Sequence, residues 1–519
     1  MTANPATLVV FLLLFVLVIA VGFLAAGWRR GDLTQLHEWG LGGRRFGTVV
    51  TWFLLGGNFY TAYTFIAVPA LVFGVGAAGF FAVPYTILMY PLLFLAFPRL
   101  WSVSRRHGYV TAADFVRGRF GNRMLALAVA VTGICATVPY IALQLRGMQI
   151  VTAALGIQTD WRVPGIGMIH NTPLLAAFTA LTLYTYRSGL RGTALIAVVK
   201  DFLIYATVLA AIIVIPAKLG GFEAIFDHIG PKAVLLTPGG GGNLGAGFAY
   251  ASLALGSALA LFLYPHSVTG ILSSSSRQAI QRNSILLPAY SFALALIALL
   301  GYVAVAAGVK GMPDYAPGFA MFGDNFAIPA LFLHSFPPWF AGVAFAAIAI
   351  GALVPAAIMA IACANLFTRN IFKEFIAPNC TPRQEAEVAK VASLAVKLAA
   401  LYFVLGLGGA YAIEMQLLGG IWIIQTLPAV LISLYTRFFN PIALLAGWAS
   451  GLIAGTWMAA TLDFQASTFV LNIAGVTVPC YAAVSALLLN LLVSYILSVV
   501  LNRFSTAPRL DETIAEDYV

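Results

Sequence analysis

Apolar runs long enough to cross a lipid bilayer recur along the whole chain, and they constrain its fold more than any other feature. A bilayer excludes unpaired backbone groups, so a spanning segment is either a helix or a strand of a closed barrel. The length of these runs fits helices, which need about 17–25 apolar residues. We count about thirteen of them: Leu8–Trp28, Thr48–Phe73, Gly79–Leu100, Met124–Leu155, Asn171–Tyr186, Gly192–Pro216, Leu244–Leu272, Ile285–Val309, Phe336–Phe367, Ala386–Val404, Ala412–Tyr435, Pro441–Ala460 and Val478–Leu501. The chain is therefore predicted to be an all-α polytopic membrane protein.

The composition agrees with this fold class. Of the 519 residues, 61% are hydrophobic and 9% are charged, whereas soluble domains have roughly 45–50% apolar and about 25% charged residues. Because the runs continue to the end of the chain, we expect residues 1–519 to form a single transmembrane unit. The segment 504–519 is expected to be a short, polar cytoplasmic tail.

The distribution of basic residues predicts the orientation. One set of alternate loops holds most of them: Arg29, Arg30, Arg44, Arg45, Arg105, Arg106, Arg117, Arg119, Arg123, Arg187, Arg191, Arg277, Arg282, Arg369, Lys373, Arg383, Lys390 and Arg437. The opposite loops hold few: Arg162, Lys218, Lys232 and Lys310. By the positive-inside rule the N-terminus lies outside and the C-terminus in the cytoplasm of a bacterial plasma (inner) membrane.

The same distribution of basic residues argues against a nucleic-acid partner and against a signal peptide. The net charge of +10 follows from loop arginines beside the spans, so no nucleic-acid partner is expected. No lysine or arginine precedes the first apolar run, while Arg29 and Arg30 follow it. This run is therefore expected to be a retained helix and not a signal peptide.

Two of the spans are interrupted, one around Asn58–Pro69 and one around Tyr264–Gly270, about 200 residues apart. An interrupted helix leaves backbone groups unpaired, which a bilayer tolerates only where they line a cavity or bind a ligand. Paired interruptions in two halves of a chain are the best sequence pointer to a transporter's substrate site. We therefore expect a carrier.

Several short motifs, taken in order, resemble the sodium:solute symporter family. They are Gly42-Gly43-Arg44, Leu55-Gly56-Gly57-Asn58, Thr111–Gly121 (TAADFVRGRFG), Gly189-Leu190-Arg191 before a span with Asp201, Tyr264-Pro265-His266, and Leu366–Ile371 (LFTRNI). The resemblance covers about residues 5–503. It implies thirteen helices with a LeuT-like core of two inverted five-helix repeats, here 48–216 and 244–435, whose first helices are broken.

One departure from the family pattern concerns the coupling ion. Members that couple to sodium place adjacent hydroxyl residues about ten positions before the Leu-Phe-Thr motif, where this chain has Gly351–Ala356 (GALVPA). Sodium is a hard cation that needs oxygen ligands. Because these hydroxyls are missing, the resemblance favours a proton as the coupling ion, with sodium still possible through backbone carbonyls.

The stretches Ala347–Ile371, Tyr140–Gln149 and Lys200-Asp201 resemble the monocarboxylate permease branch, whose members move pyruvate and lactate.

Ionisable residues inside the spans are candidates for the site, because charge near the bilayer centre is costly. Arg146 is the first candidate for a substrate anchor, since a guanidinium matches a carboxylate bidentately. The alternative is a structural arginine that reaches the interface near a helix end. Lys397 and Glu414 lie near predicted span ends, and both are expected to be interfacial.

Asp201, Lys200 and His266 are the candidates for proton coupling. A desolvated carboxylate takes up a proton near neutral pH, and a histidine titrates there without perturbation. Adjacent helical residues point about 100° apart, so Lys200 and Asp201 need not touch. The structural alternatives are an ion pair that only holds the bundle together and a packed histidine.

Polar residues in and near the interruptions complete the predicted substrate site. Asn58, Tyr60 and Thr61 lie in the first one, where helix ends and short polar side chains favour an anionic group. Tyr264 lies in the second, and it is equally suited to packing. Gln144 is either a substrate contact or an amide that joins helices.

The leading functional hypothesis is a secondary transporter that takes up short monocarboxylates such as pyruvate and lactate, with a proton. The alternative is a sodium-coupled symporter for another small solute, such as an amino acid or pantothenate. A membrane enzyme needs a nucleophile and base or a metal cluster, and no such grouping stands out. We therefore expect no catalytic residue, metal or cofactor. A solute sensor is also considered, although no signalling domain follows the last span.

Overall fold

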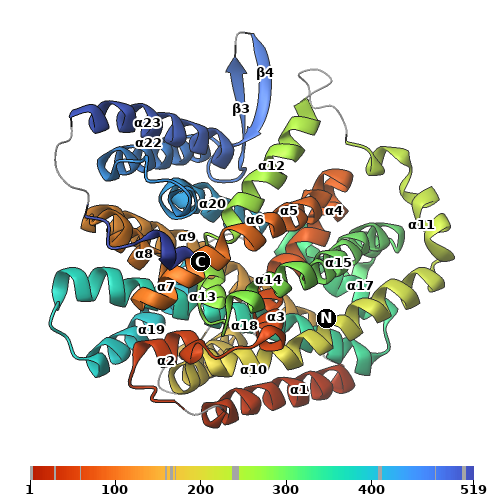
Figure 1. Cartoon of the computed structure of the whole chain (residues 1–519). Coiled ribbons are helices and arrows are strands. Elements are labelled where there is room, and N and C mark those ends of the chain that lie inside the picture. The colour runs from red at the N-terminus through yellow and green to blue at the C-terminus, as the bar shows by residue number, and fades with distance from the viewer. Residues whose placement is uncertain are drawn as a thin grey trace.

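The protein is a helical bundle with two small hairpins (Figure 1). This computed structural model describes residues 4–28, 31–58, 60–157, 160–163, 167–169, 171–236, 245–406, 412–473, 475–504 and 510–519. Seven helices are long: α1 (Pro5–Leu24), α9 (Arg123–Ala154), α10 (Thr172–Lys218), α18 (Pro338–Phe367), α19 (Pro382–Gly406), α22 (Pro441–Ala460) and α23 (Ala482–Phe504).

The other spans consist of shorter helices that follow one another: α3 (Thr48–Gly57) and α4 (Val68–Val75); α5 (Ala82–Leu88), α6 (Tyr90–Leu95) and α7 (Phe97–His107); α12 (Gly245–Leu261) and α13 (Pro265–Leu272); α14 (Arg277–Leu286) and α15 (Pro288–Ala306); α20 (Ala412–Ile423) and α21 (Leu427–Val430). Short helices connect the spans: α2 (Leu36–Leu41), α8 (Ala112–Phe120), α11 (Gly221–Ile229), α16 (Ala316–Phe322) and α17 (Ala327–Ser335). Two antiparallel hairpins are formed by β1 (Trp161–Val163) with β2 (Gly167–Ile169), and β3 (Thr468–Ile473) with β4 (Val476–Tyr481).

The number of spans agrees with the sequence. Within the described residues, ten helical stretches are long and apolar enough to cross a membrane, and the pair α12–α13, bent by 48°, adds an eleventh. Gly76 (φ 67°) separates α4 from the following span, and Gly189 (φ 55°) divides α10 into two spans. Both glycines have a positive φ, which other residues rarely adopt. With α3 joined to α4, the described residues form the expected thirteen spans, which confirms the all-α polytopic fold.

Helix α18 lies at the centre of the bundle. Its most apolar 18-residue window is entirely buried inside the protein, and it contacts α1, α9, α10, α13 and α19. Most of its buried residues are small: a Cβ at Gly342, for example, would lie 2.6 Å from the Thr7 carbonyl oxygen of α1. Small residues let helix backbones approach closely, which is the main source of helix association in a membrane.

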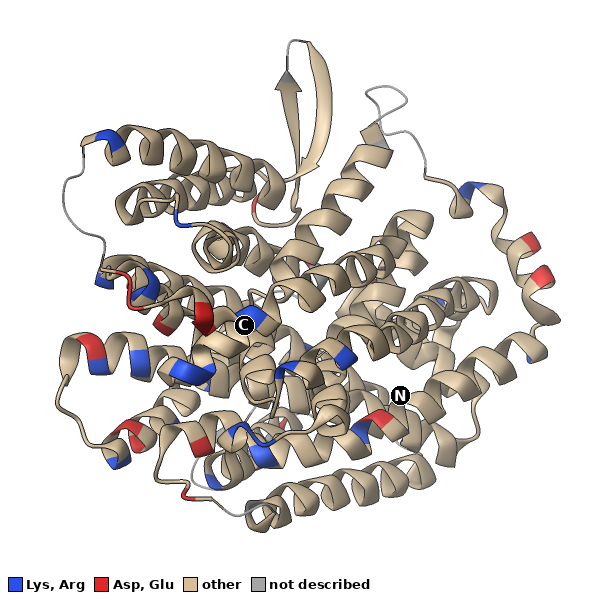
Figure 2. Ribbon diagram, viewed as in Figure 1, with Lys and Arg blue, Asp and Glu red and all other residues tan. Residues whose placement is uncertain are grey.

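Charged residues gather at one end of the bundle, around α2, α7, α8, α19 and the C-terminus (Figure 2). We call this end the arginine-rich face. The two broken spans are joined here, since Phe46 before α3 pairs with Ser274 after α13 as an isolated β-bridge. The Phe46 N–H donates to the Ser273 carbonyl (3.3 Å) and the Ser275 N–H to the Phe46 carbonyl (2.8 Å). The start of α3 and the end of α13 are therefore held together.

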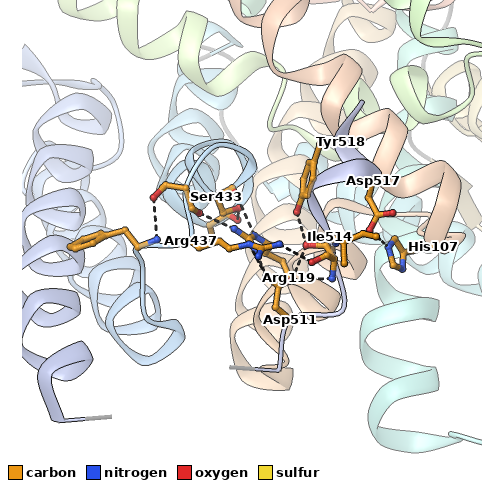
Figure 3. Close-up of polar contacts among 12 residues, drawn as sticks. His107, Arg119, Ser433, Arg437, Asp511, Ile514, Asp517 and Tyr518 are labelled. Carbon is orange, nitrogen blue, oxygen red and sulfur yellow. Dashed lines mark hydrogen bonds and ion pairs between the residues drawn. The ribbon is translucent and has the colours of Figure 1, made fainter. Parts of the chain in front are cut away.

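The C-terminal segment 510–519 packs onto this face instead of extending freely from it. Asp511 forms ion pairs with Arg119 of α8 and with Arg437, which precedes α22. Asp517 binds His107 of α7 at 2.8 Å, and Tyr518 is buried. Figure 3 shows these contacts from three separate parts of the chain. The tail thus connects α7, α8 and the turn before α22.

The docked tail is expected to stay in place at neutral pH. Burial acts to raise the pKa of Asp517, but hydrogen bonds from His107, the Ile514 N–H and Arg106 outweigh it and leave the pKa below its ordinary value. A carboxyl group whose pKa is lowered by folding stabilises the folded state at pH values above its unfolded pKa of about 3.9. This stabilisation is lost as the pH falls through the folded pKa. The contribution is therefore constant from about pH 5 upward.

Deleting residues 510–519 is expected to lower the melting temperature of the detergent-purified protein by about 2–4 °C, because the buried Arg119 of α8 and the partly buried His107 of α7 lose partners worth about 1–3 kcal/mol. Differential scanning fluorimetry at pH 6 and pH 8 measures this, with a deletion of 514–519 as an intermediate variant. An unchanged melting temperature would show that the docking contributes nothing to stability.

Candidate functional site

The first break is shorter than its sequence suggests. α3 ends at Gly57, and helix resumes with a π-helical turn at Tyr63–Ala67 that leads directly into α4. The predicted interruption of Asn58–Pro69 is therefore wrong in its extent. Pro69 lies within this continuous helical stretch, where it lacks the N–H that would pair with the preceding turn. The break is confined to the residues between Gly57 and Ala62.

The second break precedes its predicted position. α12 ends at Leu261 and α13 already begins at Pro265, so the predicted interruption of Tyr264–Gly270 is helical over most of its length. Pro265 occupies the first helical position of α13, which its fixed φ favours. Tyr264 is the extended residue before it (φ −57°, ψ 136°), and the bend between the two helices lies at this point.

Lys200 of α10 satisfies the backbone of the first break. Its ammonium group donates to the carbonyl oxygens of Gly57 (2.7 Å) and Tyr60 (3.2 Å), and it lies 3.1 Å from the Asp201 carboxylate. The last carbonyls of a helix have no partner in the helix itself. Both side chains are 0% exposed, and although they are neighbours in one helix they do converge, because the lysine side chain is long.

Asp201 connects this group to α15. Its second carboxylate oxygen accepts a hydrogen bond from the Tyr290 hydroxyl at 2.5 Å, and the Tyr60 hydroxyl donates to the Tyr290 carbonyl at 3.4 Å. Two glycines of the Leu55–Asn58 motif make room for these contacts. A Cβ on Gly56 would lie 2.0 Å from the Tyr290 ring, and one on Gly57 would lie 3.0 Å from the lysine nitrogen.

Gln144 of α9 holds the other side of the first break. Its side-chain oxygen accepts the Ala62 N–H at 2.9 Å, and its amide nitrogen donates to the Tyr140 carbonyl at 3.2 Å. Gly147, one turn further, would place a Cβ 2.4 Å from the Ala62 Cβ. Gln144 is thus engaged at both ends with backbone, which makes it a positioning residue for the break.

Two buried polar side chains at the breaks have no hydrogen-bond partner among the described residues. Both ring nitrogens of His266 and both amide atoms of Asn58 are in this state. Asn58 follows α3 and lies beside Gly270 of α13, within 3.8 Å of a Cβ placed there. Buried polar groups are almost always paired in proteins, so these two are the groups best placed to receive a ligand.

An aromatic wall surrounds His266. The ring centroids of Tyr140 and Tyr264 lie 5.6 Å and 5.5 Å from that of the histidine. The Tyr264 hydroxyl donates to the Gln416 carbonyl at 2.9 Å, and Tyr140 lies one turn before Gln144, which accepts the Ala62 N–H at the end of the first break. The two breaks therefore meet around one site. Tyr140 and Tyr290 were missed in the sequence, where the only signal was an aromatic hydroxyl within a span.

Arg146 does not join this group. Its guanidinium donates to Gln149 at 2.8 Å and to the Met321 carbonyl at 3.5 Å, and it lies over the Phe322 ring with 4.6 Å to the centroid. These contacts lie late in α9 and in α16, at the end of the bundle opposite the arginine-rich face. The Arg146 side chain is half-buried, and its part in substrate binding stays a prediction.

The structure also locates Lys397 of α19 and the part of α18 that lies near the first break. Lys397 is 1% exposed, so its side chain lies inside the bundle, and its interfacial position stays a prediction. Helix α18 approaches the first break at Gly351, where a Cβ would lie 3.8 Å from the Tyr60 carbonyl oxygen. Within the described part of the chain, no group of three or more His, Cys, Asp or Glu residues is arranged to hold a metal ion.

Two broken helices that meet at buried charged and polar groups, inside a bundle of membrane spans, define the class of secondary transporters. The sodium:solute symporter family model matches residues 39–455. The chain is 48% identical over 502 residues to a "Monocarboxylate transport permease protein" of Rhizobium johnstonii, covering 96% of this chain and 97% of the relative. It is also 24% identical to the "Sodium/proline symporter" of Escherichia coli, over 77% of each chain.

A solved structure of a Na⁺-coupled sialic acid symporter in its substrate-bound, outward-open state has the same fold. The TM-score is 0.74 at 16% sequence identity, and the match covers 98% of this chain and 99% of that one. The protein is therefore an integral membrane transporter with a LeuT-like core. It belongs to the sodium:solute symporter family, and it resembles the monocarboxylate permease branch.

Proposed function

We propose that this protein is a secondary transporter that takes up short monocarboxylates, such as pyruvate and lactate, together with a proton. The observation that carries the substrate class is His266, a buried histidine without a partner among the described residues, placed in the first turn of α13. The N-terminal end of a helix favours an anion, and the imidazole can donate a hydrogen bond to a carboxylate. The name of the Rhizobium relative supports the same class.

The site is small and aromatic, which suits a short acid. A carboxylate at His266 would lie against the Tyr140 and Tyr264 rings, with Asn58 and Thr61 in the first break as further polar contacts. Tyr60 and Gln144 would act through the backbone they hold. No step in this binding needs a covalent intermediate or a cofactor, and we propose no enzymatic activity.

Proton coupling is proposed through Asp201, Lys200 and His266. Neutral amino groups, carboxylates and imidazoles all take up protons, and the three residues lie around the breaks. The absence of hydroxyls in Gly351–Ala356 supports this choice, because sodium would lack side-chain ligands from α18. The sodium-coupled alternative, for an amino acid or pantothenate, is favoured by the sodium/proline relative and by the carbonyl oxygens of the first break.

Transport would proceed by alternating access. Residues 48–216 and 244–435 would be the two inverted repeats, and the spans that begin at α3, α5, α12 and α14 would rock as a four-helix bundle against their neighbours. We place the arginine-rich face and the tail in the cytoplasm and the N-terminus outside, in a bacterial plasma membrane. Arg146 would then lie near the outer entrance, where its positive charge attracts carboxylates.

Ligand binding tests the substrate class directly. Pyruvate and lactate are expected to raise the melting temperature of the purified protein in a saturable way, because a ligand that binds only the folded state stabilises it. Lactamide, which lacks the charge, should have at least a tenfold weaker effect. His266→Ala is expected to remove the response, while His228→Ala, at an exposed histidine of α11, should keep it. A response to proline or pantothenate alone would favour the sodium-coupled alternative.

A further inference from the structure

The ammonium group of Lys200 has the surroundings of a bound metal cation. Three oxygens lie around it: the carbonyls of Gly57 and Tyr60 at 2.7 and 3.2 Å, and the Asp201 carboxylate at 3.1 Å. An ammonium group has three N–H donors and no acceptor: it donates to the two carbonyls and pairs with the carboxylate as an ion pair. The group is fully buried.

The oxygens come from the kind of structure that binds coupling ions. Unwound backbone at a broken membrane helix and the C-terminal end of a half-helix coordinate cations in transporters, since their carbonyls have no helical partner. Gly57 is the last residue of α3 and Tyr60 lies in the break itself. Asp201 supplies the negative charge that a cation site inside a bilayer requires.

The side of this space that faces α18 is apolar. A Cβ on Gly351 of α18 would lie 3.6 Å from the Ile204 side chain and 3.8 Å from the Tyr60 carbonyl oxygen. No hydroxyl from Gly351–Ala356 reaches the space. An ammonium group needs no fourth ligand there, whereas a sodium ion prefers additional oxygens. The apolar side of α18 therefore suits an ammonium group better than a sodium ion.

We propose that the Lys200 ammonium group takes the place of the coupling metal ion at this break, so that the protein carries its own cation and binds no sodium there. This deepens the proposed function, since it assigns the reason for proton coupling, but it concerns an ion and its test uses no substrate. Removing the amino group leaves a buried carboxylate that faces two carbonyl oxygens, an arrangement that an added monovalent cation stabilises.

The test compares purified full-length proteins by thermal unfolding in sodium chloride and in choline chloride at equal ionic strength. Wild-type protein is expected to melt at the same temperature in both salts. Lys200→Ala is expected to be stabilised by sodium, saturably and by at least about 2 °C. Lys200→Met fills the space without a charge, and it should not respond. In the double variant Lys200→Ala with Asp201→Asn the response should disappear, because the anionic oxygen is lost.

Each other outcome counts against the proposal. Sodium stabilisation of wild-type protein equal to that of Lys200→Ala would show that the lysine does not occupy the cation position. A folded Lys200→Ala protein that ignores sodium would show that no cation site lies beneath it. Failure to recover Lys200→Ala in either salt has the same meaning, since sodium is expected to restore folding. If wild-type protein fails to transport pyruvate, the proposed function fails while these results stand.

Discussion

Uptake by Asp201→Asn is expected to be at least 100-fold slower than by the wild type. The carboxylate pairs with Lys200 at 3.1 Å and accepts the Tyr290 hydroxyl at 2.5 Å. Its neutralisation leaves a buried ammonium group without a counterion, which costs about 3–5 kcal/mol when one partner of a buried pair is lost. An amide also cannot exchange a proton in the transport cycle. The initial rate of labelled pyruvate uptake into proteoliposomes measures the effect.

The matched control for this substitution is Asp227→Asn on α11, where the carboxylate is exposed. It should transport at the wild-type rate, because exposed charges contribute little to stability. Protein recovery and melting temperature must be recorded for both variants, so that loss of folding is separated from loss of transport. An Asp201→Asn protein that retains more than half of the uptake would remove Asp201 from the coupling site.

A single methyl group in the first break should have a comparable effect. Gly56→Ala places a Cβ 2.0 Å from the Tyr290 ring, so the ring must move and release Asp201. Overpacking of a well-packed core costs about 1–3 kcal/mol, and the lost hydrogen bond adds to this. We expect uptake to fall at least tenfold with a lower melting temperature.

Gly47→Ala is the control for this second substitution, since it lies at the start of the same helix and a Cβ there has no neighbour within 4 Å among the described residues. Its uptake and melting temperature should match those of the wild type. If Gly56→Ala behaves like this control, the close approach of α15 to the first break is not needed for transport.

The architecture followed from the sequence because lipid imposes a simple rule. A span must be a long apolar helix, and thirteen such runs were visible. The breaks were located but their predicted extents were wrong, since Pro265 begins a helix and Pro69 lies inside one that continues through it. A proline in the first turn and one in the middle of a helix look alike in a sequence, although their backbone consequences are opposite.

The contacts within the site were harder to predict from the sequence. Lys200 and Asp201 were expected to point apart, because helical geometry separates neighbours by about 100°. A long flexible side chain overrides this separation when carbonyl oxygens attract it from another helix. The depth of Arg146 within α9 had no local signal, and its contacts with α16 depend on packing between distant segments. The docking of the tail likewise joins residues 411 positions apart, which no local pattern reveals.

Family membership gives the class of transporter, whereas individual residues of this chain bear on the solute and the ion. Membership in the sodium:solute symporter family covers residues 39–455, yet the family includes relatives named for a monocarboxylate and for proline. The family alone therefore leaves the solute and the ion open. The lysine at the first break and the apolar side of α18 are properties of this chain, and our proposal of proton coupling rests on them.

The most direct test of proton-driven monocarboxylate transport is the accumulation of labelled pyruvate by proteoliposomes under an inward proton gradient, with choline as the only other cation. We expect accumulation that a protonophore abolishes and that an added inward sodium gradient does not increase. Liposomes with Asp201→Asn protein correct for passive entry of the acid. Accumulation that strictly requires the sodium gradient would contradict proton coupling and the role of Lys200 as the resident cation.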